Sequence, residues 1–201
     1  MILFPAGIPI TITEYKALLH LEADPEQWLL DALATKARRR REALINEWRP
    51  RLFEDPTVMH LPANEADLAK LIVSRPDYRS RVQSDAELES PALVHQDNKE
   101  RYDAVDRSGE IITLFATGIH ISQHDYDYIL SYVQELNEWV YGAILGHINR
   151  GTKKMILQYQ PVLMADPDVA TFPATKEGMV EVITARADYQ TLPERYEAVP
   201  Q

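Results

Sequence analysis

The chain contains no cysteine, only 7 glycines among its 201 residues, and no long uninterrupted apolar stretch. Without cysteine there is no disulfide framework, no thiolate zinc site, no iron–sulfur cluster and no cysteine nucleophile, so folding depends on the burial of apolar side chains. The sequence also lacks a Gly-rich phosphate loop, a dinucleotide fingerprint and a Gly-flanked nucleophile elbow. These absences disfavour catalysis, and we predict a protein that is not an enzyme and uses no cofactor.

Membrane insertion and nucleic-acid binding are disfavoured as well. No apolar run approaches the ~18 residues that a membrane helix needs, and the opening Met1–Pro5 has no basic flank before it, so we expect no membrane span and no signal peptide. Positive charge is scarce, because 21 Lys and Arg face 31 Asp and Glu, which gives a formal net charge of -10. A surface that binds nucleic acid needs excess positive charge, so we do not expect nucleic acid as a partner.

What the sequence does contain is an internal duplication. At an offset of 111, residues 1–78 align with residues 112–189 without a gap, and 22 of the 78 aligned positions are identical. We interpret these segments as one ancestral unit present twice, the first repeat and the second repeat. A feature present in both repeats then belongs to the fold, and a feature present in one repeat belongs to the function of that repeat.

The duplication divides the chain into four parts: repeat unit 1 over residues 1–81, an acidic linker or hairpin over 82–111, repeat unit 2 over 112–193, and a C-terminal tail over 194–201. Residues 82–111 carry 8 acidic and 3 basic side chains, which is half of the net charge. This composition is typical of a solvated linker. Alternatively, Tyr102 to Phe115 form a hairpin with Arg107-Ser108-Gly109-Glu110 at its centre.

Each repeat begins with an apolar segment rich in β-branched residues, Ile2–Ile12 and Ile112–Ile121, which predicts a short strand. Because the two predicted strands occupy equivalent places, we expect them to pair with one another across a pseudo-twofold axis. A short helix should follow, capped by Thr11 or Thr13 in the first repeat and by Ser122 in the second.

A long helix comes next in each repeat. In the first repeat Asp24-Pro25-Glu26-Gln27 is a dense helix-start signal. The second repeat lacks this signal, which predicts that its short and long helices run together. Pro50 and Pro161 should kink or end the long helices. The apolar positions shared by both repeats trace one helical face, which predicts the core stripe: Trp28/Trp139, Leu29/Val140, Leu33/Ile144, Ala37/Ile148, Leu44/Met155, Ile45/Ile156, Trp48/Tyr159 and Leu52/Leu163.

Each repeat closes with an Asp-Pro turn, at Asp55 and Asp166, and with a short helix capped by Asn64 or Thr175. The predicted fold class is therefore mainly α with a small β element. In this prediction two tandem repeats of strand, short helix, long helix, turn and short helix form a pseudo-twofold pseudo-dimer, since a lone unit of this size has a marginal core.

The most conspicuous candidate binding feature is the run Arg38, Arg39, Arg40 and Arg41. At about 100° per residue four arginines surround most of a helix, so Arg40 or Arg41 must lie close to the apolar stripe. The run could bind phosphate or a carboxylate-rich partner. Alternatively, the arginines are solvated or paired within the chain, with Glu42 and Glu47 in reach of Arg38 and Arg51.

His120, His124, Asp125 and Asp127 form the cluster that most resembles a metal site. Two histidines four residues apart share a helical face, as in a zinc site. However, His120 falls in a predicted strand, a third ligand has no obvious source, and the first repeat has Pro9 and Thr13 at the matching places. We therefore favour a polar helix start and predict no metal site.

The region around Trp28 contains four motifs in sequence: Tyr15-x-Ala17-Leu18, Asp24-Pro25-x-x-Trp28-x-x-Asp31-Ala32, Lys36-Ala37-Arg38 and Asp55-Pro56-x-Val58-x-x-Leu61-Pro62. With these motifs the chain resembles short tailed-bacteriophage proteins over residues 10–62 and, more weakly, over 121–173. Those proteins have a strand, a Tyr-x-x-Leu helix, a Trp-x-x-Asn-Ala helix with basic residues, and a closing Asp-Pro segment. Asp31 stands where the family has Asn, and the second repeat has Gly142 there.

Proteins of this kind are commonly encoded among virion structural genes. The resemblance therefore implies a non-catalytic structural or assembly component of a phage particle, such as a tail, neck or capsid accessory protein. It would act through other virion or assembly proteins, or as a homo-oligomer, in the virion and in the host cytoplasm during assembly. As its contact residues we predict the arginine run and four residues of exposed apolar strands, namely Leu3, Phe4, Leu114 and Phe115. The alternative is a regulatory or nucleic-acid-associated adaptor that uses the arginine run.

Overall fold

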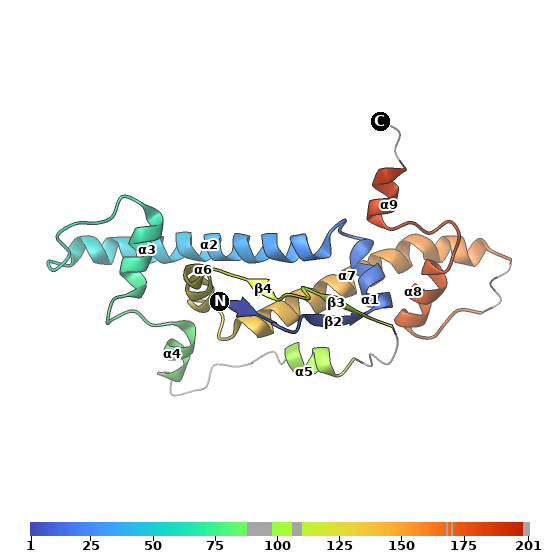
Figure 1. Ribbon diagram of the computed structural model, residues 1–201, viewed down its shortest axis with the longest axis horizontal. Coiled ribbons are helices and arrows are strands. Elements are labelled where there is room, and N and C mark those ends of the chain that lie inside the picture. The colour runs from blue at the N-terminus through green and yellow to red at the C-terminus, as the bar shows by residue number, and fades with distance from the viewer. Residues whose placement is uncertain (88–97, 106–109, 168, 170, 199–201) are drawn as a thin grey trace. The chain divides into compact units, whose positions relative to one another are not determined.

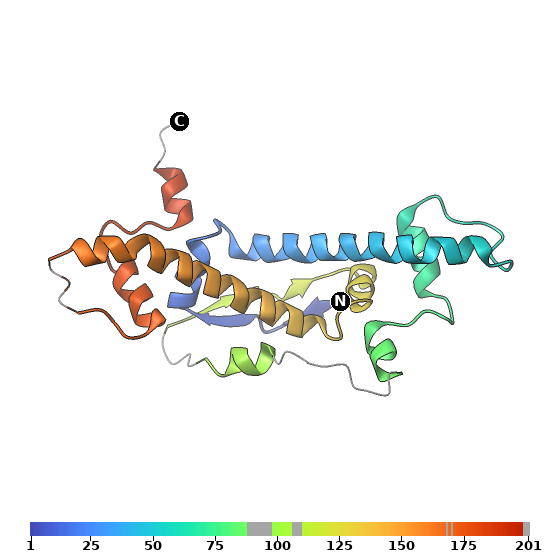
Figure 2. The ribbon, with the colours of Figure 1, turned by 180° about the vertical axis from the view of Figure 1, so that it is seen from behind.

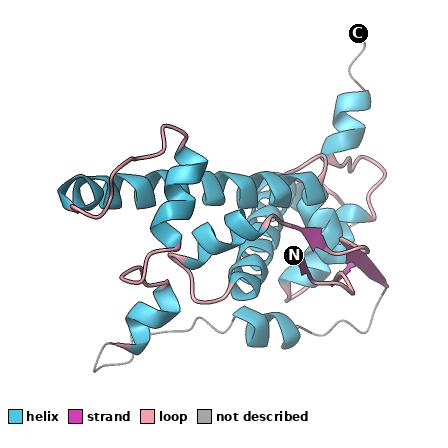
Figure 3. Cartoon of the chain, turned by 60° about the vertical axis from the view of Figure 1, so that its left-hand side comes forward, coloured by secondary structure: helices cyan, strands magenta, loops and turns pink. Residues whose placement is uncertain are grey.

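The computed structural model describes residues 1–87, 98–105, 110–167, 169 and 171–198. The described chain is mainly helical with two small antiparallel sheets, which confirms the predicted mainly α class with a small β element (Figures 1 and 3). The elements in chain order are β1 (Ile2–Leu3), β2 (Ile8–Thr11), α1 (Ile12–Leu19), α2 (Pro25–Glu54), α3 (Glu65–Val73), α4 (Arg81–Ala86), α5 (Asn98–Asp103), β3 (Ile111–Leu114), β4 (Ile119–His120), α6 (Gln123–Leu130), α7 (Leu136–Ala165), α8 (Lys176–Thr184) and α9 (Leu192–Glu197).

The chain divides into two compact units. Unit 1 contains Met1–Leu3, Leu30–Asp97 and Ile119–Val140, and unit 2 contains Phe4–Leu29, Asn98–Gly118 and Tyr141–Gln201. Each unit therefore combines residues from both repeats, and the compact units do not follow the sequence boundaries 1–81 and 112–193.

The strands explain this exchange between repeats. The sequence predicts that the two strand segments pair, and they do: β1 pairs with β4 in unit 1, and β2 pairs with β3 in unit 2, both antiparallel. In both sheets the backbone N–H and C=O groups of a strand from one repeat form hydrogen bonds with a strand of the other repeat. This pairing therefore carries α1 into the unit that holds most of α7, where α1 packs against α8.

Helix starts follow the predicted caps. Thr11 forms a capping box with Glu14 at the start of α1, and Ser122 accepts from the Asp125 amide at the start of α6. The Gln27 amide donates to the Asp24 carboxylate, 3.0 Å away, at the start of α2.

The prediction that α6 and α7 run together is wrong. After α6 ends, the Ser131 hydroxyl donates to the Tyr128 carbonyl, 2.6 Å away, and the chain turns. The first intrahelical bond of α7 then starts at the Glu135 carbonyl, which accepts from the Trp139 amide. A serine hydroxyl that bonds the last turn stops a helix locally, and residue propensities do not report this.

Neither proline ends its helix. α2 continues past Pro50 to Glu54, and α7 continues past Pro161 to Ala165 (Figure 1). Both prolines are exposed, and so are Asn46 and Leu157, whose carbonyls lose their helical donor. On an exposed face water can bond the freed carbonyl, so the prolines are tolerated there.

Short helices also replace parts of the predicted linker and tail. α4 and α5 lie within residues 81–103, and Tyr102 is on α5, so the first strand of the predicted hairpin is wrong; residues 106–109, at its centre, lie outside the described residues. α9 crosses the predicted start of the tail at residue 194. It begins 111 residues after α4 (192 − 81), and both helices follow a capping box. The charged composition of these segments is typical of a linker, so it did not predict two capped helices of six residues each.

The predicted core stripe is buried except at four half-buried positions, which are Trp28, Trp139, Ile156 and Tyr159. In unit 1 the core is formed by α2, α3 and Tyr128 of α6, and it includes Trp48 and Leu52. In unit 2 α7 and α8 contribute Met155, Leu163, Val180 and Ile183. The core of unit 1 thus depends on a residue from the second repeat.

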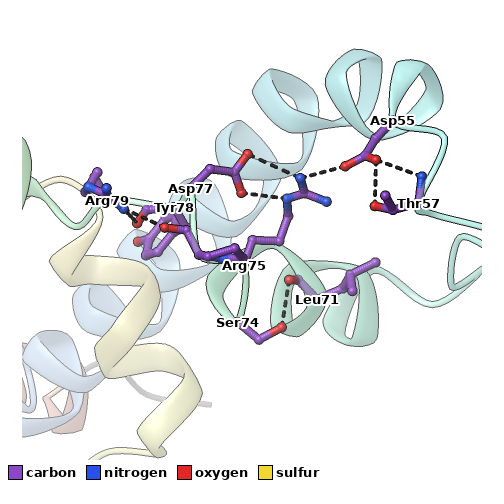
Figure 4. Close-up of polar contacts among 9 residues, drawn as sticks. Asp55, Thr57, Leu71, Ser74, Arg75, Asp77, Tyr78 and Arg79 are labelled. Carbon is purple, nitrogen blue, oxygen red and sulfur yellow. Dashed lines mark hydrogen bonds and ion pairs between the residues drawn. The ribbon is translucent and has the colours of Figure 1, made fainter.

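One arginine bridges two aspartates in each unit. Arg75 contacts Asp55 at 2.7 Å and Asp77 at 2.8 Å (Figure 4). Arg186 contacts Asp166 at 2.6 Å and Asp188 at 2.8 Å in the same pattern. Asp55 therefore connects the end of α2 to the segment after α3, and Asp166 connects the end of α7 to the segment after α8.

We expect the bridge between Asp55 and Arg75 to stabilise the fold above about pH 4. Hydrogen bonds from Thr57 and from Arg75 lower the pKa of Asp55 to about 2. A carboxyl group with a depressed pKa stabilises the folded state above its unfolded pKa, and this contribution disappears as the pH falls toward 2. Arg75→Gln should therefore lower the urea midpoint clearly at pH 7 and little at pH 2.

The control for this experiment is Arg51→Gln, which removes an exposed pair with Glu47 at 3.5 Å and should change the midpoint little at either pH. Equal effects of Arg75→Gln at pH 7 and pH 2 would contradict the prediction.

Candidate functional site

The four strand residues predicted as contacts are not available to a partner. Leu3, Phe4, Leu114 and Phe115 have exposed fractions of 3–9%. The Phe4 ring lies edge-on against Tyr141, with centroids 5.0 Å apart, and the Phe115 amide donates to the Glu26 carboxylate at 2.6 Å. The prediction of exposed apolar strands is wrong, because all four side chains are buried in the hydrophobic core.

The arginine run does not form a single basic surface. Arg38 and Arg39 are exposed, whereas Arg40 and Arg41 are half-buried, as the helical geometry predicts. The Arg40 guanidinium stacks over the Tyr132 ring at 4.3 Å, and Arg41 lies 3.9 Å from Glu65. Two of the four charges are therefore engaged within unit 1.

The histidine cluster does not converge. His120 is exposed on β4 and His124 is exposed on α6, while Asp125 is engaged by the Ser122 cap. Within residues 1–87, 98–105, 110–167, 169 and 171–198, no three side chains of the His, Cys, Asp and Glu types come together as a metal site would require.

Each of two tryptophans contacts a side chain that sequence reasoning did not single out. In unit 2 Trp28 stacks on His147, with ring centroids 3.8 Å apart, and His147 contacts Glu22 at 3.1 Å and Arg150 at 2.7 Å. In unit 1 Lys36 lies over Trp139 at 4.9 Å. Lys36 and His147 are 111 positions apart, as Trp28 and Trp139 are. Each tryptophan therefore contacts the residue that aligns with the partner of the other tryptophan. We assign these pairs to packing.

Unit 2 has an apolar groove of about 810 Å³ on its surface. It lies along the C-terminal half of α7 and the start of α8. Figure 2 shows the ribbons of these two helices from behind. Its lining residues are Asn149, Lys153, Ile156, Leu157, Gln160, Met164, Phe172, Pro173, Ala174, Thr175, Lys176 and Met179.

Three large apolar side chains of the groove are exposed. Leu157 is 61% exposed, Met164 70% and Phe172 46%. Leu157 and Met164 lie two turns apart on α7, and Phe172 precedes α8. Exposed apolar side chains that cluster in this way mark a binding surface more often than scattered ones do.

Comparison of matching positions in the two repeats shows which groove residues are particular to the second. Lys153, Leu157 and Lys176 stand where the first repeat has Glu42, Asn46 and Glu65. In unit 1 Glu65 approaches Arg41, an ion pair that Thr152 and Lys176 cannot form. The groove therefore has two lysines and a leucine where the aligned positions 42, 46 and 65 have two glutamates and an asparagine.

The electrostatics of the groove are positive. Lys153 and Lys176 are the charged residues of its lining, and both are exposed. Lys176 is also the first residue of α8, where the helix dipole is positive, and the Thr175 hydroxyl accepts from the Gly178 amide. An apolar surface with a cationic rim can bind an apolar group that carries negative charge.

The sequence carries a signal for this site in the two lysines of the groove. The two lysines occupy positions where the other repeat has glutamates, which is a complete reversal of charge at equivalent places. Detecting their proximity required the fold, because α7 and α8 bring residues 153 and 176 to the same groove.

No protein-family model, curated protein or solved structure matches the chain. Among the described helices, none combines the length and the apolar character required to cross a membrane.

Proposed function

We propose that this protein is a non-catalytic structural or assembly component of a bacteriophage particle and that it acts through contacts with other virion proteins. The observation that carries the proposal is the groove of unit 2, a surface for contact with exposed Leu157, Met164 and Phe172. The sequence resemblance to tailed-bacteriophage proteins supports the phage context.

We further propose that the chain is a tandem duplicate whose repeats form a pseudo-twofold pseudo-dimer. Strand register supports this arrangement: Leu3 pairs with Ile119, and exchanging the repeats (3 + 111 = 114; 119 − 111 = 8) gives the other observed pair, Leu114 with Ile8. Equivalent helices also begin 111 residues apart, as α2 at Pro25 and α7 at Leu136 do.

A duplicated chain allows a protein to gain a new contact surface without losing its fold. One repeat can acquire a new surface while the features common to both, such as the arginine bridges, maintain the fold. Here the second repeat carries the groove, whereas the matching positions of the first repeat carry Glu42, Asn46 and Glu65.

The test is whether the chain enters particles. Virions of the phage that encodes the chain, purified by density gradient, should contain it in a constant ratio to other virion proteins when measured by quantitative mass spectrometry. If the chain is a transient assembly factor, immature particles from an assembly-blocked infection should contain it instead. A chain absent from both particle types would contradict the proposal.

A further inference from the structure

We infer that the groove of unit 2 binds a short segment of a partner protein that combines large apolar side chains with carboxylates. This inference rests on the proposed function, because it assumes that the groove is a protein-contact surface, and it adds the chemistry of the partner. Three features of the groove lead to it: the position of Lys176, the exposed apolar side chains and the charge difference between the repeats.

Lys176 occupies a position that is unfavourable for the fold alone. It begins α8, a nine-residue helix, where the dipole favours an anion and disfavours a cation by about 0.3–1 kcal/mol. The first repeat has Glu65 at the equivalent start of α3, which suits the dipole. Residues that break a local rule without a structural gain are expected at functional sites. A bound carboxylate would interact favourably with both Lys176 and the helix start.

The apolar part of the groove indicates that the ligand is more than an anion. Leu157 exposes 61% of its surface where the first repeat has an asparagine, and Met164 and Phe172 extend the apolar surface. Burial of such side chains by a partner is worth about 25 cal/mol per Å² of apolar area, which a small inorganic anion cannot supply. Met164 and Leu157 are flexible side chains that can adapt to an inserted segment.

Charge complementarity indicates that the partner segment is negatively charged. Among the described residues, the lining includes Lys153 and Lys176 and no acidic side chain, although the whole chain has a formal net charge of -10. A locally cationic groove on an acidic protein selects against basic segments and attracts an acidic one at short range. The binding mode is that of an acidic amphipathic segment laid into an apolar groove.

The experiment is a selection of 12-residue peptides from a random displayed library against the immobilised full chain. A variant with the residues of the first repeat, Lys153→Glu with Lys176→Glu, serves as the counter-selection target. Selected peptides are then synthesised, and fluorescence anisotropy measures their affinity. We expect enrichment of Asp or Glu beside Leu, Phe, Met or Trp, and an affinity that falls at least about tenfold for the charge-reversed variant and with Asn and Gln in place of the peptide carboxylates.

Two further variants distinguish the groove from general electrostatics. Leu157→Asn should weaken binding of the same peptides by about fivefold or more, because it removes apolar area from the groove. Lys154→Glu lies on the same helix but outside the groove lining, and it changes the net charge by half as much as the double variant. It should leave affinity within about twofold. Circular dichroism and the urea midpoint of each variant confirm that it is folded; Lys176→Glu should be at least as stable as the original chain because of the α8 dipole.

Several results would overturn the inference: enrichment of basic or uncharged peptides, affinities equal for the original chain and the charge-reversed variant, or no enrichment. Concentration-dependent self-association abolished by Leu157→Asn would overturn it in favour of a second copy as occupant. Binding of anionic vesicles abolished by the same variant, without peptide enrichment, would overturn it in favour of a lipid. The particle experiment is separate: a chain found in virions without acidic-peptide binding contradicts this inference alone, whereas peptide binding by a chain absent from particles contradicts the phage role alone.

Discussion

Replacing Gly151 by alanine is expected to destabilise unit 2 by about 3 kcal/mol or more, at the upper end of the range for overpacked sites. Gly151 lies on α7, and a Cβ atom there would be 2.0 Å from the carbonyl oxygen of Ala17 on α1. The contact is with backbone, so a rotamer change cannot relieve it, and α1 and α7 would have to separate. The measurement is urea unfolding followed by circular dichroism.

Gly146 provides the matched control for this substitution. It lies on the same helix, and an added Cβ would meet none of the described residues within 4 Å. Gly146→Ala should therefore stabilise the protein by up to about 1 kcal/mol, because alanine is the better helix former. If Gly151→Ala were as stable as the original chain, the close approach of α1 and α7 would be wrong.

The second large effect is a loss of stability in mild acid, caused by His20. The His20 side chain is completely buried and packs against the rings of Tyr159 and Tyr189, which also contact each other. Among the described residues neither ring nitrogen has a partner in hydrogen-bonding geometry, although Gln158 lies near enough to favour the charged form. Burial, and then the charges of Arg195 and Lys154, lower the pKa of His20 to about 4.

The sign of the effect follows from the two pKa values. In the unfolded chain the imidazole takes up a proton near pH 6.5, but in the folded chain it does so only near pH 4. Between these values the unfolded state binds more protons, so the free energy of unfolding falls as the pH falls. The full loss between pH 7.5 and pH 4 should be roughly 3 kcal/mol from His20.

The test is the urea midpoint between pH 7.5 and pH 4 for the original chain and for His20→Phe, which retains an aromatic ring. The variant should lose most of this pH dependence. His147, whose pKa is lowered by burial and by Arg150, should account for a smaller remaining slope in the same direction. An unchanged slope in His20→Phe would show that His20 is not buried as the neutral form.

Local sequence signals predicted much of the secondary structure. Thr11, Asp24, Asn64 and Ser122 cap helices as expected, and the shared apolar stripe of the long helices is largely buried. These predictions succeeded because a cap or a helical face depends on residues within one or two turns. The arginine run also followed helical geometry, with Arg40 turned toward the protein and Arg38 exposed.

The candidate site was harder to predict, because it depends on which residues become neighbours. Phe4 and Phe115 look like exposed strand residues in the sequence, but their burial depends on contacts with Tyr141 and with Glu26. In the same way, the sequence does not distinguish Lys153 and Lys176 from other surface lysines. The packing of α7 and α8 brings both of them to the same groove.

The sequence by itself therefore determined the repeated order of elements, the caps and the apolar faces, since these follow from intervals of a few residues. Only the tertiary structure decided that α1 packs in the unit of α8, that Tyr128 completes the core of unit 1, and that the second repeat carries an open groove. The physical reason is that strand pairing and close packing select among partners far apart in the chain. Local propensities do not distinguish those partners.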